Sequence, residues 1–216
     1  KNFNNINVES NYVNVGASVL DKVLSKFCLE QSIQGFEFLT GIPGCLGGAV
    51  AMNAGCYGSE IKDIFLSAKC LDYQGNEIII DYSEDLFSYR NNTKTKDLII
   101  LEIKLKKLNG NKNEIFNKME KINKNRILSQ PQKVRTAGST FKNPTSQSSK
   151  KAWELIEISG SKTIERNNVT LSDKHANFIV NKQFESANDI ETFGELIRKK
   201  VFDKTGVLLE WEIKIL

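Results

Sequence analysis

The stretch from Gly41 to Gly58 constrains the fold more than any other part of the chain. It reads GIPGCLGGAVAMNAGCYG, holds six of the chain's 14 glycines in 18 residues, and contains no charged side chain. Glycine lets the backbone enter left-handed conformations and approach a neighbour or a ligand closely. Backbone amides of such a loop can also bind anions without any charged side chain. Composition therefore leaves two interpretations open: a tight, buried turn system or a phosphate-binding loop.

Two common nucleotide-binding patterns are excluded for this stretch. It lacks the G-x-x-x-x-G-K-[ST] pattern of a P-loop. It also lacks a G-x-G-x-x-G that follows a strand and precedes an acidic residue by about twenty positions, as in dinucleotide-binding folds. A phosphate-binding role would have to follow a different pattern.

The composition is that of a globular chain with a weak positive charge. Its 216 residues are 40% hydrophobic, and 30 Lys and Arg against 26 Asp and Glu give a net charge of +4. That excess favours anionic small molecules and falls well short of a nucleic-acid-binding domain. The four cysteines show no C-x-x-C spacing and there is one histidine, so we expect free thiols and no metal site. The sequence also has neither an apolar run long enough to cross a bilayer nor a signal-peptide core, which predicts no membrane insertion.

Hydrophobic periodicity in the first half predicts short strands and one early helix. Alternation predicts a strand at 11–18, and apolar residues at helical spacing predict a helix over 19–30. Residues 65–83 are typical of two strands around a Gln74-Gly75 turn. Clean alternation over 98–108 predicts a half-buried strand.

The second half follows a helical pattern, which predicts a separate lobe. The polar segment 108–113 is the best candidate for a linker, and an amphipathic helix follows it. Further helices are predicted around 150–159 and over 187–206, where the second has a capping box from Ser186 and a terminal Gly206. Alternation over 207–216 predicts a final strand. The chain is therefore expected to be an α+β protein in two lobes.

The order of residues in the glycine stretch resembles the flavin-binding segment of the UDP-N-acetylenolpyruvoylglucosamine reductases, the MurB family of peptidoglycan synthesis. The resemblance rests on GIPG, GGA and MNAG followed by YG. It implies that FAD lies along this loop and the helix start after it, with Tyr57 on the substrate side. The implied cofactor-binding residues are Gly41, Ile42, Pro43, Gly44, Gly47, Gly48, Ala49, Asn53 and Gly55.

The resemblance also implies an α+β architecture with two domains. Residues 1–107 would form the second lobe of an FAD-binding domain of the PCMH/vanillyl-alcohol-oxidase type. Residues 108–216 would form the family's α+β C-terminal substrate domain. No tyrosine-bearing insertion is present between the lobes, which is similar to the shorter of the family's two subtypes.

Three further strings match the family's catalytic elements. In FSYRNN, Arg90 takes the catalytic position, although a loop arginine is more often a solvated charge, and Asn92 stands where serine is usual. In AGSTFKNP, which alone reads as a turn, the resemblance implies that Ser139 is the proton donor and Asn143 a substrate contact. A serine hydroxyl is a poor acid, so it needs a neighbour such as Lys142 or a water to relay a proton.

In LLEWEIKIL, Glu212 is implied to act with Arg90 on the enol intermediate. Alternation alone would make Glu212 part of an ordinary solvated strand face. Glu210, one inward–outward repeat away, is expected to be a surface residue.

Two basic positions match substrate contacts, and some neighbours depart from the pattern. Arg126 in RILSQP is implied to bind the substrate, and His175 in SDKHANF to contact its diphosphate, although a lone histidine is more often structural. Ser129 stands where a basic residue is usual. Asn167-Asn168 replaces a Gly-Gly pair and Thr163 replaces a glycine, and asparagine is the next best residue for a positive φ.

The resemblance implies a cytoplasmic, NADPH-using flavoenzyme that converts UDP-N-acetylglucosamine enolpyruvate to UDP-N-acetylmuramate. Its partners would be FAD, NADPH and a UDP-sugar, without nucleic acid. The family's first flavin-binding lobe would precede Lys1 and is a candidate for a separate partner chain. The alternative is a non-catalytic remnant or fragment that needs the missing lobe to bind FAD.

Overall fold

The computed structural model describes residues 3–215. Backbone contacts divide the chain into two compact units, Lys1–Arg126 and Ile127–Leu216. Each unit combines helices with antiparallel strands, which confirms the predicted α+β class. The two units are described separately.

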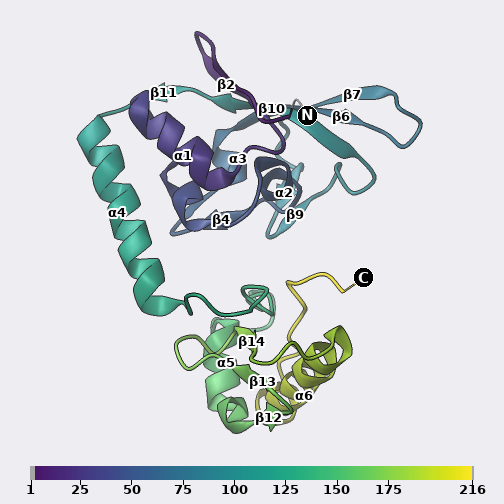
Figure 1. Ribbon diagram of the computed structural model, residues 1–216. Coiled ribbons are helices and arrows are strands. Elements are labelled where there is room, and N and C mark those ends of the chain that lie inside the picture. The colour runs from purple at the N-terminus through teal and green to yellow at the C-terminus, as the bar shows by residue number, and fades with distance from the viewer. Residues whose placement is uncertain (1–2, 216) are drawn as a thin grey trace. The chain divides into compact units, whose positions relative to one another are not determined.

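The first unit is built on a five-stranded sheet in the order β1-β2-β10-β6-β7, with all neighbours antiparallel (Figure 1). Four of its strands, β2, β6, β7 and β10, lie where the sequence predicts strands, and the turn between β6 and β7 places Gly75 at φ 87°. The strands are β1 (Ile6–Val8), β2 (Tyr12–Gly16), β6 (Phe65–Leu71), β7 (Glu77–Asp81) and β10 (Ile99–Lys106).

Figure 1 shows α1 (Asp21–Glu30) and α2 (Leu46–Ala51) on the same side of this sheet. Their buried side chains form one hydrophobic core with the inward-facing residues of β2, β6 and β10. The shorter elements of this unit are β3 (Ile33–Gln34), the 3₁₀ helix η1 (Glu37–Gly41), β4 (Gly55–Cys56), β5 (Ser59–Glu60), α3 (Ile61–Ile64), β8 (Phe87–Ser88), β9 (Asn91–Asn92) and β11 (Leu108–Asn109). The glycine stretch therefore runs from the end of η1 through α2 to β4, at the border of the core.

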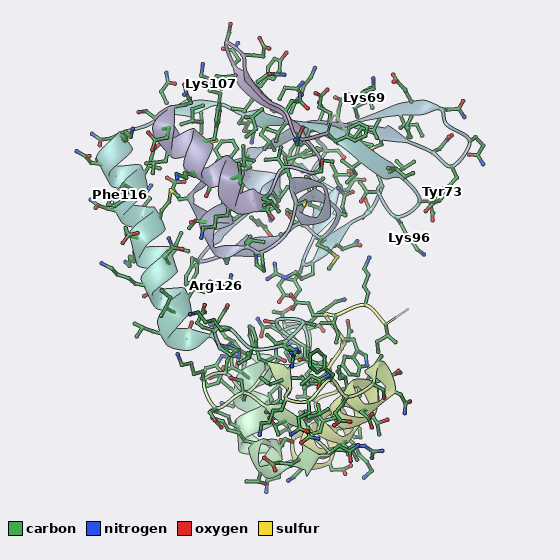
Figure 2. All side chains as sticks on the ribbon, in the orientation of Figure 1. Lys69, Tyr73, Lys96, Lys107, Phe116 and Arg126 are labelled. Atoms are coloured by element: carbon green, nitrogen blue, oxygen red, sulfur yellow. The ribbon has the colours of Figure 1, made fainter. Side chains whose placement is uncertain are left out.

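The expected linker at 108–113 has regular structure. Strand β11 pairs with β3, and α4 (Lys112–Ser129) begins directly afterwards. Helix α4 buries Ile115 and Met119 against Leu29, while Phe116 of the predicted apolar stripe is 50% exposed. Figure 2 shows Arg126 close to the C-terminal end of this helix. The functional domain boundary at residue 107 stays a prediction.

The second unit packs two helices against a three-stranded antiparallel sheet in the order β12-β13-β14. Its elements are α5 (Ala152–Ile158), the 3₁₀ helix η2 (Ser161–Thr163), β12 (Glu165–Arg166), β13 (Val169–Leu171), β14 (Ile179–Asn181) and α6 (Ala187–Thr205). Both ends of α6 are as predicted: the Ser186 hydroxyl accepts the N–H of Asp189, and Gly206 ends the helix at φ 72°. Within residues 3–215, none of the helices is long and apolar enough to cross a membrane.

The prediction of a regular final strand is wrong for the described residues 207–215. This segment has one isolated antiparallel bridge, between Phe141 and Trp211. Leu209 is fully buried in the core of the second unit, so the alternating pattern reflects burial of single side chains. Too few consecutive backbone groups find partners for a ladder.

The departures from the family's glycines are accommodated in this unit. Asn167 adopts φ 50° in the turn between β12 and β13, and its side chain donates to Asp189 Oδ1 at 3.1 Å. Thr163 is absent from the residues with positive φ, and its hydroxyl donates to the Gly160 carbonyl at 3.1 Å. The turn between β12 and β13 therefore needs a residue that tolerates positive φ at position 167. Position 163, in η2, has no positive φ and does not need a glycine.

Candidate active site

Arg90 lies at the tip of the hairpin formed by β8 and β9. Ser88 and Asn91 pair across this hairpin, so Tyr89 and Arg90 form a two-residue turn in which Arg90 has φ 56°. The Arg90 Nη2 donates to the carbonyl of Gly55 at 3.1 Å, and the guanidinium carbon lies 5.2 Å from the centre of the Tyr89 ring. Arg90 is thus attached to the glycine stretch, whereas a solvated loop arginine would have no such fixed contact.

Arg126 approaches the same stretch from α4. A Cβ atom added at Gly41 would lie 3.9 Å from Arg126 Nη1 and 3.5 Å from Cys56 Sγ. The positive charges of Arg126 and Arg90 both act to lower the pKa of Cys56, but burial outweighs them and raises it to about 11. The fold therefore gathers both predicted arginines around Cys56, whose thiol stays protonated near neutral pH and is not a nucleophile.

A cavity of about 570 Å³ opens beside these residues. Tyr57, at φ 54° and 50% exposed, lies in its wall, so the predicted substrate-facing tyrosine is accessible. Its lining also includes Cys56, Phe38 and, from α4, Lys118, Lys121 and Ile122. Glu37 also lines the cavity, and its Oε1 lies 3.7 Å from Lys118 Nζ, so the lining carries charges of both signs.

The predicted cofactor-binding residues occupy four short elements. Gly41 ends η1, and Ile42, Pro43 and Gly44 form the loop before α2. Gly47, Gly48 and Ala49 lie in α2, Asn53 follows it, and Gly55 begins β4. Pro43, Gly44 and Gly48 are exposed, whereas Gly41, Ala49 and Asn53 are buried. Flavin binding by this set stays a prediction.

Two of these glycines show opposite environments. A Cβ at Gly55 would lie 2.6 Å from the Cβ of Glu60 and 2.7 Å from the carbonyl oxygen of Ser59, so no side chain fits there. A Cβ at Gly48 would meet no atom within 4 Å. Gly55 is therefore required by packing of the chain on itself, while Gly48 leaves bare backbone facing open space.

Asp21 is a buried carboxyl behind the Pro43-Gly44 loop. Its backbone N–H donates to the Gly44 carbonyl at 3.1 Å, and the side chain is 1% exposed with Oδ1 unpartnered. Burial raises the pKa of Asp21 to about 7. Near neutral pH this carboxyl is therefore partly protonated.

In the second unit, the segments that carry Ser139 and Glu212 are both held by their common neighbour Thr140. The Glu212 N–H donates to the Thr140 carbonyl at 2.8 Å, and the Thr140 N–H donates to the Asn177 carbonyl at 2.8 Å. Ser139 itself bridges to Phe178. The fold thus brings together three segments that are far apart in sequence, including two of the predicted catalytic residues.

Asn143 and His175 have structural partners in this unit. The Asn143 Oδ1 accepts the N–H of Ala152 at the start of α5, at 3.0 Å. His175 Nδ1 accepts the N–H of Asn177 at 3.2 Å, and burial lowers the pKa of His175. A neutral imidazole can donate from Nε2 to a diphosphate, but brings no positive charge. Substrate binding by Asn143 and His175 stays a prediction.

Lys142 and Glu210 form an ion pair with 3.5 Å between Nζ and Oε2. Glu210 is exposed, as expected. The ion pair holds the ammonium group of Lys142 beside the Glu210 carboxylate. A cavity of about 270 Å³ lies in the same unit and is lined by Ala137, Thr140 and Ile213, among others. These lining residues flank Ser139 and Glu212 in the sequence, so both segments border the cavity.

Comparison with known proteins gives the family of this chain. Residues 1–81 match a model described as an FAD binding domain, and residues 130–216 match the C-terminal domain of UDP-N-acetylenolpyruvoylglucosamine reductase. The enzyme of that name from Rickettsia akari (strain Hartford) is 45% identical over 216 residues, which are 100% of this chain and 72% of the relative. The chain belongs to the UDP-N-acetylenolpyruvoylglucosamine reductase family.

Other members of this reductase family agree in sequence and in structure. The Rickettsia typhi (strain ATCC VR-144 / Wilmington) reductase is 46% identical over 214 residues, covering 99% of this chain and 72% of the relative. The crystal structure of the Thermus caldophilus reductase covers 93% of this chain and 71% of that chain, with a TM-score of 0.80 and 31% identity. The resemblance in the glycine stretch and the three further strings therefore extends over the whole chain.

The residues of this reductase-family chain fit a flavin at the glycine stretch. Pro43, Gly44 and Gly48 expose uncharged backbone. A Cβ atom added at Gly48 would have no neighbouring atom within 4 Å, so the space beside this residue is open. A planar ring system can lie against such a surface because no side chain stands in its way. FAD is the cofactor of the family model that covers this part of the chain.

Sequence reasoning missed two residues that the fold places beside the predicted site. Cys56 lies close enough to both arginines for their charges to act on its thiol, and no pattern in the sequence marks it. Asn92, noted as a departure from serine, is 3% exposed and its Nδ2 donates to the Val50 carbonyl of α2 at 3.4 Å. An amide in place of a hydroxyl gives the longer reach that this contact needs.

Proposed function

We propose that the protein reduces the enolpyruvyl group of UDP-N-acetylglucosamine enolpyruvate to give UDP-N-acetylmuramate, with FAD as cofactor and NADPH as hydride donor, in peptidoglycan synthesis. The observation that carries this proposal is the attachment of Arg90 to Gly55 in the flavin-type glycine stretch. A guanidinium fixed in this way can stabilise negative charge that develops on a substrate carboxylate.

Hydride transfer is the chemistry that FAD supplies when bound, and the chain's own residues supply the rest. Arg90 holds the substrate carboxylate and, with Glu212, stabilises the enolate-like intermediate. Ser139 donates a proton from its hydroxyl to the substrate carbon next to the carboxylate. Arg126 and Tyr57 bind the anionic and sugar parts of the substrate, and Asn143 and His175 contribute further polar contacts.

The experiment separates the two half-reactions by rapid mixing without oxygen, followed by the flavin absorbance. In Ser139→Ala, NADPH should reduce the flavin at a rate within about twofold of the wild type, because no proton donor acts in that step. Reoxidation by the enolpyruvyl substrate should slow by about 10² to 10⁴, the usual contribution of general acid catalysis. Ser146→Ala, at an exposed serine of the same unit, is the matched control.

Two outcomes contradict the proposal. If both half-reactions slow equally in Ser139→Ala, the proton-donor role is wrong. If the wild-type protein shows neither bound flavin nor substrate turnover, the reductase proposal fails for this chain and the non-catalytic alternative is favoured.

A further inference from the structure

The hairpin that carries Arg90 is attached to the glycine stretch at three points. Arg90 Nη2 donates to the Gly55 carbonyl, and Asn92 Nδ2 donates to the Val50 carbonyl at 3.4 Å. Between them, Asn53 Nδ2 donates to the Ser88 carbonyl at 3.2 Å. Every acceptor is a backbone carbonyl, so each attachment fixes main chain as well as a side chain.

Asn53 is the most deeply buried of these donors. It is 0% exposed and adopts φ 41°. Besides Ser88, its Nδ2 donates to Glu60 Oε2 at 2.9 Å, and its Oδ1 accepts the N–H of Lys62 at 3.1 Å. Both amide hydrogens are therefore used within the chain. No donor of this side chain remains for a cofactor.

The contact with Ser88 controls the turn because of where Ser88 lies. It pairs with Asn91 and immediately precedes the two-residue turn Tyr89-Arg90. A two-residue turn has few free dihedral angles once its flanking pair is held. Fixing the Ser88 carbonyl therefore fixes the Cα of Arg90 and the direction from which its side chain leaves the backbone.

We propose that Asn53 is a positioning residue for Arg90: by linking β5, α3 and the β8–β9 hairpin, it holds the guanidinium in register with the glycine stretch. The importance of this register rests on the proposed function, in which Arg90 touches the substrate. Small displacements of a charge-stabilising group reduce catalysis strongly, because the group no longer lies where charge develops. Asn92 supports the same hairpin from its other strand, through a longer and weaker contact.

The first test needs neither cofactor nor activity. Hydrogen exchange by mass spectrometry is measured on the whole protein for the wild type, Asn53→Asp and Asn92→Ala. Asn53→Asp keeps the size and the acceptor, removes both donors and places a second carboxyl against Glu60, so amides within 87–92 should exchange about tenfold faster or more. Asn92→Ala should raise exchange there by about threefold. Asn53→Gly, which removes the whole side chain and tolerates φ 41°, should act as Asn53→Asp does and keeps the test available if Asn53→Asp does not fold.

The matched control is Asn91→Ala. Asn91 lies in the same hairpin, is exposed, and donates only to the Ser88 hydroxyl at 3.4 Å. Its loss should leave exchange at 87–92 within about twofold of the wild type. The proposal is overturned if Asn53→Asp leaves 87–92 unchanged. It is also overturned if residues 65–71 of β6 speed up equally, since that shows general destabilisation.

The second test uses the half-reactions. In Asn53→Asp, flavin reduction by NADPH should stay within about twofold, while reoxidation by the enolpyruvyl substrate falls about 10²-fold. Added to Arg90→Ala, Asn53→Asp should cost less than about threefold more, because the two residues act as one unit. Full additivity would mean that Asn53 acts independently of Arg90, and would overturn the proposal. If the wild type lacks turnover, the proposed function fails, but hydrogen exchange still decides the role of Asn53.

Discussion

The glycine stretch of the first unit and the turn region 160–168 of the second both contain positions where the family favours glycine, and this chain treats them differently. At Gly55 the glycine is kept, because the backbone of β5 leaves no room for a Cβ. At Asn167 the glycine is replaced, because the turn requires only φ 50°. A glycine needed for close approach has no substitute, whereas one needed for a positive φ can be replaced by asparagine.

Of the substitutions considered, Gly55→Ala should lower the free energy of unfolding most. A small loss would contradict the comparison between the two kinds of glycine. The added Cβ must displace Glu60 or the Ser59 carbonyl, so we expect a loss of about 2–3 kcal/mol in the free energy of unfolding. Urea denaturation measures this. The matched control is Gly48→Ala in α2, where the Cβ meets nothing and alanine should stabilise the ligand-free chain by about 0.5–1 kcal/mol. Equal effects of the two substitutions would contradict the packing argument.

Asp21→Asn tests the part of the glycine stretch around Gly44. The backbone there is exposed, but the Asp21 carboxyl behind it is buried. Because burial raises the pKa of Asp21 from 3.8 to about 7, the folded state holds this proton more tightly than the unfolded state. The stabilisation is complete below pH 3.8 and is lost as the pH rises to about 7. Asn cannot ionise, so the variant should exceed the wild type in unfolding free energy by about 1–3 kcal/mol at about pH 8.

Denaturation of the wild type and Asp21→Asn at about pH 5 and about pH 8 checks this expectation. The advantage of the variant should shrink on acidification. Asp97→Asn, at an exposed carboxyl of the same unit, serves as the control and should follow the wild-type profile. Parallel pH profiles for Asp21→Asn and the wild type would show that this carboxyl does not ionise differently in the folded state.

Substitutions at Asn167 should have the smallest effects and test the other half of the comparison. Asn167→Ala should lower the unfolding free energy by about 1–2 kcal/mol, because alanine tolerates positive φ poorly. Asn167→Gly should stay within about 0.5 kcal/mol of the wild type, since it loses only an exposed contact with Asp189. Thermal and urea unfolding give both values. If Asn167→Ala were as stable as Asn167→Gly, the positive φ at this position would not explain the presence of asparagine.

Much of the fold was predictable because it depends on local pattern. Alternation and helical spacing locate β2, β6, β7, β10, α1, α5 and α6, since burial of one face imposes those periods on the sequence. The same rule failed at 207–215, where single side chains are buried and the backbone forms one isolated bridge in place of a ladder. The pattern reports burial, and burial alone does not determine hydrogen bonding.

The sequence by itself determined the family, the α+β class, and the residue types of the proposed site, because these follow from local order and spacing. Only the tertiary structure decided that Arg90 reaches Gly55, 35 residues away, and that Arg126 approaches Gly41. It also decided that Asn53, predicted as a cofactor contact, uses its side chain on Glu60, Lys62 and Ser88. The physical reason is that hydrogen bonds between distant segments depend on how the sheet and helices pack, which no local pattern encodes.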